Sequence, residues 1–336
     1  MNAPIRPDAL VSYGEAQLHE ETFRAFLDAQ APAPKVSAEP PVPSGRKLLP
    51  AFRSARELAA ELPEDVPWIV PGYLARGSMT EVDGRAKAAG KSTWLTHLVA
   101  AVLDGAPFLG RPTEQTGVVY LTEQPPTSLR ALLGRTGLTD RDDLRLLLWR
   151  DCRGTPWPEL VEVAVAECRS VGAGILIVDT LGAFTGVRGD SENDAGAALE
   201  AMTPLLGAAA DGLAVIVARH DRKGGGDVGD SGRGSTAYTG AVDIVLRLAR
   251  TDETRPTVRE LSALSRFEET PPKLYIELTG DGYRVLGDEA AYVLADARAK
   301  LTEGLPSDEG LTMAQVLDSI VRERTTAQSA MQGGFW

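Results

Sequence analysis

The stretch that decides the fold is Gly84-Arg85-Ala86-Lys87-Ala88-Ala89-Gly90-Lys91-Ser92-Thr93. An extended segment, 79–82, precedes it, and an amphipathic segment, 94–103, follows it. This order predicts a strand, a phosphate-binding loop and a helix, because small residues let backbone N–H groups close on phosphates at an electropositive helix N-terminus. Lys91 is placed to contact the β- and γ-phosphates of ATP, and the Ser92 hydroxyl is placed to ligate Mg²⁺.

The spacing of the glycines departs from the usual phosphate-loop motif. In that motif the first glycine would stand at position 85, but Arg85 occupies this position and Gly84 comes one residue earlier. The alternative is a turn rich in glycine and alanine before a helix capped by Ser92. The strand, loop and helix context favours the phosphate loop. The expected nucleotide-binding residues are Gly84, Lys87, Ala88, Ala89, Gly90, Lys91, Ser92 and Thr93.

A second segment, 174–180, is a short apolar run that ends in Asp179. Such a run is typical of a strand buried on both faces of a parallel sheet. The carboxyl ends of parallel strands form the crevice in which these sheets bind ligands. We therefore expect Asp179 to hold Mg²⁺ through water beside Ser92; the alternative is an aspartate that caps the next turn.

A third segment, 117–122, reads as a strand and is followed by Glu123. Hydrolysis requires a carboxylate that orients and deprotonates the attacking water. The residue after Asp179 is Thr180 rather than glutamate, so the best-placed base is Glu123, at the end of a different strand. The alternative is an acidic residue in a solvated loop.

The order of these motifs resembles the RecA-like ATPases and, within them, the DnaB-type and RepA-type helicases. The segments 53–58 and 67–74 are similar to the lead-in of RepA-like ATPases of plasmids and phages, and the resemblance covers roughly residues 55–290. It implies an α/β fold, a RecA-like P-loop NTPase with a mostly parallel, doubly wound sheet. Helices are expected at about 127–135, 157–171, 191–210 and 288–302, alternating with the strands.

A fourth strand, 213–218, is followed by His220. The RecA-like family places glutamine or histidine here to contact the γ-phosphate, so His220 fits that role; the alternative is a surface histidine. The glycine-rich segment 224–235 follows, and loops at this place line the central channel of hexameric RecA-like helicases. The resemblance implies that Lys223 and Arg233 contact DNA, and a plain flexible connector is the competing interpretation.

The segments 239–248 and 257–267 read as strands, and the second contains Arg266. RepA-like and DnaB-like proteins place at this position the arginine finger that reaches a neighbouring subunit's γ-phosphate. DnaB-like proteins often carry lysine two residues earlier, where this chain has Leu264. The resemblance therefore implies a homo-oligomer, a hexameric ring with ATP between subunits, and the alternative is that Arg266 is a surface arginine.

The resemblance implies a DNA-dependent ATPase or helicase that acts in plasmid, phage or mobile-element DNA replication or recombination, with single-stranded DNA as its partner. The alternative is a regulatory P-loop ATPase that switches partner binding without unwinding DNA. A phosphotransferase acting on a small molecule is disfavoured, because the sequence shows no lid with clustered arginines.

Composition limits these possibilities. The net charge of −12 argues against broad coating of DNA, although a local basic channel needs only a few lining residues. The two cysteines, Cys152 and Cys168, show no metal-binding spacing, which predicts a reduced, cytoplasmic protein. No apolar run is long enough to span a membrane.

Three parts of the chain are expected. Residues 1–45 form a Pro-rich segment that is predicted to be disordered. Residues 46–290 form the RecA-like ATPase core. Residues 291–336 are expected to form a helical C-terminal segment, whose stretches 311–317 and 325–332 resemble the first two helices of a winged-helix module. The expectation is either a truncated module or one that the protein has lost.

Overall fold

The computed structural model describes residues 52–187, 194–220, 228, 237–251 and 254–303, and the chain divides into two units, 1–62 and 63–336. The Pro-rich segment 1–45, Lys223, Arg233 and the winged-helix segments after 303 lie outside the described residues. None of the described helices is long and apolar enough to cross a membrane.

In the first unit, the described residues form one short helix, α2 (Ala55–Glu61). The Ser54 hydroxyl accepts a hydrogen bond from the Glu57 N–H at 3.2 Å, and the Glu57 carboxylate accepts one from the Ser54 N–H at 2.7 Å. This reciprocal pair is a capping box, and the hydrogen bonds that the Glu57 carboxylate accepts from the Ser54 N–H and hydroxyl lower its pKa. No helix was expected here, although the serine and the glutamate three residues later are a helix-start signal.

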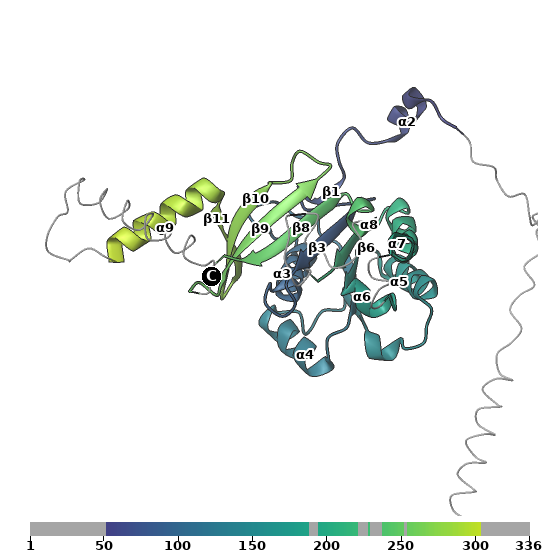
Figure 1. The fold of residues 1–336 in the computed structure, drawn as a ribbon. Coiled ribbons are helices and arrows are strands. Elements are labelled where there is room, and N and C mark those ends of the chain that lie inside the picture. Colours follow the sequence, from purple (N-terminus) through teal and green to yellow (C-terminus); the bar gives the residue numbers. More distant parts are fainter. Residues whose placement is uncertain (1–51, 188–193, 221–227, 229–236, 252–253, 304–336) are drawn as a thin grey trace, which may run out of the picture. The chain divides into compact units, whose positions relative to one another are not determined.

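The second unit is built on a nine-stranded sheet (Figure 1). In spatial order its strands are β11 (Gly282–Gly287), β10 (Lys273–Thr279), β9 (Val258–Ser265), β8 (Ile244–Arg250), β3 (Met79–Gly84), β7 (Ala214–Ala218), β6 (Ala173–Asp179), β4 (Gly117–Thr122) and β5 (Leu144–Leu148). The six strands from β8 to β5 are parallel, and β9, β10 and β11 continue the sheet antiparallel to their neighbours. The predicted RecA-like α/β fold with a mostly parallel sheet is confirmed.

The helices cover both faces of this sheet. They are α3 (Lys91–Asp104), α4 (Pro126–Arg135), α5 (Trp157–Val171), α6 (Leu181–Phe184), α7 (Ala195–Ala210), α8 (Ala237–Gly240) and α9 (Glu289–Glu303), with a short 3₁₀ helix, η1 (Trp149–Asp151). A separate pair of short antiparallel strands, β1 (Trp68–Val70) and β2 (Leu74–Ala75), lies before β3.

Two apolar cores lie on opposite faces of the sheet. Ile175 and Ile177 of β6 pack in the core that includes α3, whereas Leu176 and Val178 pack in the core that includes α5 and α7. Alternating residues of one strand thus enter both cores, as expected for a parallel strand covered on both faces. The apolar run before Asp179 is explained by this double burial.

One strand prediction was wrong at its beginning. The segment 239–248 was expected to be extended throughout, but α8 occupies 237–240 and β8 begins only at Ile244. The N–H groups of Ala241 and Val242 donate back to Tyr238 and Thr239, which closes a helical turn. Regular apolar packing of a strand starts only after this turn.

Helix α7 begins at Ala195, where the Asp194 carboxylate caps it at 2.9 Å from the Ala197 N–H.

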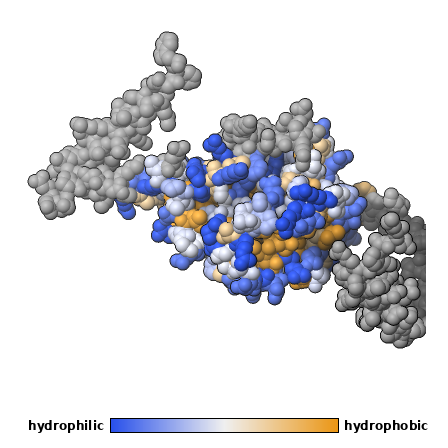
Figure 2. Space-filling model, turned by 90° about the horizontal axis from the view of Figure 1, so that it is seen from below, coloured by the Kyte–Doolittle hydropathy of each residue, from blue (hydrophilic) through white to orange (hydrophobic). Residues whose placement is uncertain are grey.

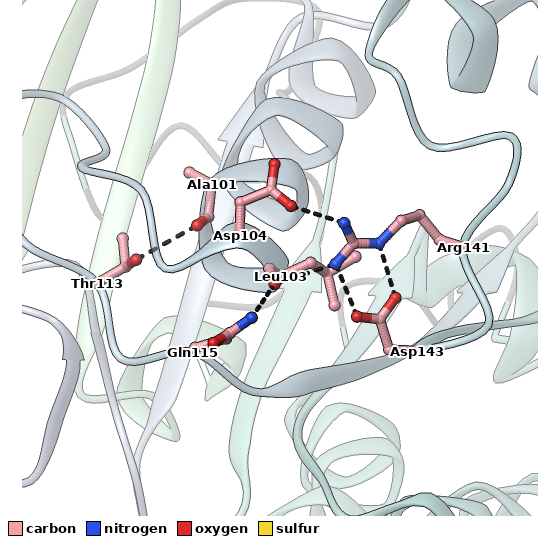
Figure 3. A network of polar contacts seen from close by, with 7 residues as sticks. All are labelled: Ala101, Leu103, Asp104, Thr113, Gln115, Arg141 and Asp143. Carbon is pink, nitrogen blue, oxygen red and sulfur yellow. Dashed lines mark hydrogen bonds and ion pairs between the residues drawn. The ribbon is translucent and has the colours of Figure 1, made fainter.

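A polar network fixes the C-terminal end of α3 (Figure 3). The Arg141 guanidinium donates to Asp104 at 2.6 Å, to Asp143 at 2.7 Å and to the Leu103 carbonyl at 3.0 Å. The Gln115 amide donates to the same carbonyl at 2.7 Å. Hydrogen bonding to Arg141 lowers the pKa of Asp143. A cation at this place satisfies the last carbonyls of the helix and complements its negative end.

The face shown in Figure 2 is mainly hydrophilic, with hydrophobic areas between the charged side chains. Exposed large apolar side chains of the described part include Val163 in α5 and Leu199 and Leu206 in α7. Scattered exposed apolar residues of this kind are ordinary on a protein surface.

Candidate functional site

The predicted phosphate loop connects β3 to α3. A Cβ atom at Gly84 would lie 2.6 Å from the carbonyl oxygen of Leu248 in the neighbouring strand β8, so close strand packing requires glycine here. The loop then turns on Arg85, whose carbonyl accepts hydrogen bonds from the N–H groups of Ala88 and Ala89 at 3.3 and 3.1 Å. The early glycine is therefore explained by strand packing, and an arginine at position 85 is compatible with the loop.

Lys91 and His220 lie side by side at the end of this loop. Gly90 has φ 86°, a left-handed conformation that favours glycine, and Lys91 then begins α3. The buried Lys91 ammonium donates to the Gly84 carbonyl at 2.6 Å and lies 3.0 Å from Nδ1 of His220. His220 follows β7, the strand next to β3 in the sheet. The structure thus brings together the two residues that were predicted to contact the γ-phosphate.

Asp179 meets Ser92 at the carboxyl end of β6. The Ser92 hydroxyl donates to the Asp179 carboxylate at 2.7 Å, and the Tyr120 hydroxyl donates to the same oxygen at 2.9 Å. Burial raises the pKa of Asp179, although these two hydrogen bonds and the nearby Lys91 charge oppose the shift. Burial and the Asp179 charge raise the pKa of Tyr120 well above 10, so this phenol stays protonated and donates.

These groups fit a magnesium ion. A hydroxyl and a carboxylate are the hard oxygen ligands that Mg²⁺ accepts in proteins, usually together with waters and substrate phosphates. Within the described residues no group of three or more His, Cys, Asp and Glu side chains could hold a metal ion. Ser92 and Asp179 could therefore hold Mg²⁺ only together with waters and the phosphates of a bound nucleotide.

Glu123 reaches the same place from the end of β4. The Thr180 hydroxyl donates to its carboxylate at 3.0 Å, and Nε2 of His220 lies 3.8 Å from the same oxygen. The neighbouring His220 ring is the main cause that lowers the pKa of Glu123, and the Thr180 hydrogen bond and the Lys91 charge act in the same direction against the effect of burial. Glu123 is therefore ionised at neutral pH and can accept a proton.

Apart from Tyr120, these side chains border one cavity of about 510 Å³. Its lining includes Lys87, Gly90, Lys91, Ser92, Thr93, Glu123, Asp179, Thr180 and His220. A second cavity of about 480 Å³ shares Glu123, Thr180 and His220 and is otherwise bordered by residues such as Trp149, Arg219 and Tyr238. The first cavity is bordered by the loop, the Lys91 ammonium, the Ser92 hydroxyl and the carboxylates of Asp179 and Glu123, which are the kinds of group that a nucleotide-hydrolysing site needs.

Comparison with known proteins agrees with this arrangement. Residues 46–226, more than half of the 336-residue chain, match the AAA domain family. The chain belongs to this family. The AAA domain is a P-loop ATPase module, so a phosphate-binding loop is expected within it. No curated protein sequence matches the chain.

Among solved structures, the chain is similar to a KaiC-like protein from the hyperthermophilic archaeon Pyrococcus horikoshii OT3. The two share 14% sequence identity over 65% of this chain and 93% of that one, with a TM-score of 0.46.

Within the AAA domain, Arg219 is a buried residue to which the sequence analysis gave no role. Its guanidinium donates to the buried Glu81 carboxylate of β3 at 2.8 Å and lies 4.1 Å from the centre of the Tyr238 ring. The Arg219 N–H also donates to the Val82 carbonyl at 3.0 Å. These contacts fix the backbone that carries His220. A charged residue directly after the apolar run of β7 was the available signal.

Arg266 lies at the opposite end of the sheet's strands from the phosphate loop. It follows β9, which runs antiparallel to β8 and pairs Ser265 with Ile244, the first residue of that strand. Its side chain is 66% exposed and its guanidinium lies 3.2 Å from the Asp243 carboxylate. The phosphate loop is a strand length away, about 20 Å at 3.3 Å per residue. Arg266 is therefore not part of the site formed by its own chain.

The structure adds partners that the sequence analysis missed. Tyr120 and Thr180 bond to Asp179 and Glu123, as described, and Arg250 and Arg259 bond to the phosphate loop from outside. Tyr120 is a polar side chain within an apolar strand, which was a usable signal. The two arginines carry no local signal, because their contact depends on the way β8 and β9 fold back toward the loop.

Proposed function

We propose that this protein is a DNA-dependent ATPase of the RepA-like, RecA-fold type, acting in the replication or recombination of plasmid, phage or mobile-element DNA. The observation that carries the hydrolytic part is the position of Glu123. Its carboxylate lies 3.8 Å from His220, which in turn lies 3.0 Å from the Lys91 ammonium. A carboxylate next to the groups expected at the γ-phosphate is the arrangement required for activating water.

The phosphates are held by the loop and Lys91. Backbone N–H groups at the start of α3 and the positive end of its dipole attract the phosphate oxygens. Lys91 neutralises charge on the β- and γ-phosphates, and Ser92 and Asp179 hold Mg²⁺. When bound, the ion neutralises the charge that develops on the phosphate oxygens during transfer.

Glu123 orients the attacking water and accepts its proton. Its carboxylate accepts a hydrogen bond from the Thr180 hydroxyl, which favours an orientation beside His220 and the cavity. Because its pKa is lowered, Glu123 is ionised at neutral pH. His220, between Glu123 and Lys91, contacts the γ-phosphate and responds to its loss.

Arg266 acts on a neighbouring subunit in this proposal. Its exposed position at the edge opposite its own phosphate loop supports a role in trans, in a homo-oligomeric ring. Lys223 and Arg233 are proposed to contact single-stranded DNA. The competing function is a regulatory ATPase that assembles with ATP and recruits a partner without acting on DNA.

The test is the rate of ATP hydrolysis with and without single-stranded DNA, together with the mass of the assembly. Stimulation by DNA in an ATP-dependent oligomer supports the proposal, whereas assembly without stimulation favours the regulatory ATPase. Glu123→Gln serves as the control for hydrolysis, because it should keep ATP binding and lose about 10²–10⁴-fold in rate. A Glu123→Gln rate within a few fold of wild type removes Glu123 from the base role.

A further inference from the structure

Two arginines outside the phosphate loop bind its carbonyl oxygens. Nε of Arg259 in β9 donates to the Ala89 carbonyl at 2.8 Å, and Nε of Arg250 in β8 donates to the Ala88 carbonyl at 3.0 Å. These two backbone carbonyl groups shortly before Lys91 are thus bonded to side chains more than 150 positions later in the chain.

Arg259 makes its bond to the loop from a buried position. Its side chain belongs to the buried set, and its Nη1 donates to the Pro256 carbonyl at 2.6 Å and to the Val258 carbonyl at 2.7 Å. Burial lowers the pKa of Arg259, because removal from water disfavours the charged guanidinium. Each bond from a charged donor to a buried carbonyl is stronger than a neutral one. One guanidinium thus joins the turn before β9 to the phosphate loop.

The turn before β9, to whose carbonyl groups Arg259 also bonds, has further contacts of its own. Arg255 forms an ion pair with Asp296 of α9 and lies 5.9 Å from the centre of the Tyr292 ring. The Val258 N–H donates to the Arg255 carbonyl at 3.1 Å. Arg259 therefore holds the loop from a braced hairpin rather than from a free surface segment.

The bond to the Ala89 carbonyl decides where the next N–H points. In a trans peptide the carbonyl and the N–H point in opposite directions, so anchoring the Ala89 oxygen on Arg259 turns the Gly90 N–H away from Arg259. Gly90 lines the nucleotide cavity and precedes the first residue of α3. A Cβ at Gly90 would lie 3.7 Å from the Tyr283 hydroxyl, so φ rather than space requires glycine there.

We propose that Arg259 and Arg250 are positioning residues that hold the phosphate loop in its anion-binding conformation by binding the Ala89 and Ala88 carbonyls. This inference rests on the proposed function, because it assumes that the loop binds ATP. The arginines do not touch the nucleotide. They set the backbone that Lys91 and the N–H groups depend on.

The test is ATP affinity and turnover of Arg259→Ala. Loss of a buried charged hydrogen bond predicts ATP binding weaker by about 10- to 100-fold. The rate at saturating ATP should stay within a few fold, because Lys91, Glu123 and Asp179 are unchanged. Guanidinium ion at millimolar concentration should restore a large part of the affinity by occupying the space left by the side chain, whereas sodium chloride at the same concentration should not.

The matched control is Arg284→Ala. Arg284 lies on β11 of the same antiparallel part of the sheet, is 66% exposed and pairs with Glu277 at 2.5 Å. It should leave ATP affinity unchanged. A folded Arg259→Ala that binds ATP within about twofold of wild type, or whose loss guanidinium does not reduce, overturns the proposal.

Arg250→Ala decides the question if Arg259→Ala does not fold. Arg250 is exposed, so its removal should leave the melting temperature unchanged and weaken ATP binding by a few fold. Unchanged affinity in this variant then overturns the proposal. Failure of the wild-type protein to bind ATP would instead reject the proposed function, while wild-type binding with unaffected arginine variants rejects the positioning role alone.

Discussion

The parallel strands begin at one side of the sheet, here called the amino edge, and end at the other, here called the carboxyl edge. At the amino edge, Arg141 is bonded to two partly exposed carboxylates and to the last turn of α3. At the carboxyl edge, Lys91 and Asp179 are both buried, and burial raises the pKa of the aspartate. The same helix, α3, connects these two edges. At its C-terminal end the Arg141 cation bonds to helix carbonyl and carboxylate groups near water. At its N-terminal end the charged Lys91 and the nearby Asp179 are buried, and burying a charge costs free energy.

This difference separates stability from function. Charges at the amino edge satisfy the helix end and neighbouring carboxylates, so they contribute to folding. Charges at the carboxyl edge lie where strand ends converge on a cavity, which is the place where α/β sheets bind ligands. Substitutions at the two edges should therefore change different measured quantities.

Lys91→Ala should give the largest effect, on the carboxyl edge. It removes the cation at the end of the phosphate loop, so ATP hydrolysis should fall below detection and nucleotide binding should weaken. The melting temperature should stay close to wild type, because the substitution also removes a buried charge. Phosphate release measures the hydrolysis rate, nucleotide titration measures the affinity, and thermal unfolding measures the melting temperature. Unchanged affinity and turnover would show that the loop does not bind phosphates.

Arg266→Ala tests the exception, an arginine at the amino edge with a predicted function. ATP binding should remain, and hydrolysis should fall by about 10³-fold or more, as is typical of arginine fingers. The folding stability should change little, because the side chain is 66% exposed.

Mixing Arg266→Ala with Glu123→Gln subunits should restore part of the activity. Some interfaces then combine an intact arginine with an intact base from the neighbouring subunit. Hydrolysis by a strict monomer at a rate independent of concentration would contradict this model and favour the regulatory ATPase.

The sequence was sufficient for the parts that repeat a local pattern. The buried strands β4, β6 and β7 consist mainly of apolar runs, and α4 and α5 match their expected ranges. Strand β5 and the hairpin of β10 and β11 were missed, because short edge strands and half-exposed strands lack a long apolar run. Their positions depend on the order of strands in the sheet.

The candidate site shows the same division. Lys91, Asp179, Glu123 and His220 could be expected together, because parallel strands end at the same edge. The contacts of Thr180 with Glu123 and of Arg259 with the loop could not, since they depend on side-chain reach across segments far apart in sequence. The roles of Lys223 and Arg233 remain predictions, because both lie outside the described residues.

Arg141→Ala should change stability and leave catalysis nearly intact. It removes the bonds to Asp104, Asp143 and the Leu103 carbonyl, and their loss should cost about 1–2 kcal/mol in the free energy of unfolding. Denaturant unfolding measures this, and hydrolysis well below the melting temperature should stay within a few fold. Arg145→Ala, which removes only a surface pair with Glu167, is the matched control and should be neutral. A loss of hydrolysis without a loss of stability would contradict the contrast between the edges.

Asp179→Asn should have the smallest effect on stability, and in the opposite direction. Burial raises the pKa of Asp179 above 3.8, so the folded chain binds that proton more tightly than the unfolded chain does. The ionised carboxylate therefore destabilises the fold at pH values above its raised pKa, and this cost disappears as the pH falls below 3.8. Asparagine carries no charge, so without nucleotide the variant should melt at a slightly higher temperature than wild type near neutral pH. The difference should shrink as the pH is lowered toward the ordinary pKa of aspartate.

The control is Tyr120→Phe, which keeps the Asp179 charge and removes one hydrogen-bond donor to it, so it should lower the melting temperature instead. An asparagine variant that melts lower than wild type at neutral pH would show that Asp179 stabilises the carboxyl edge as Arg141 stabilises the amino edge, and that the two edges do not differ in this respect.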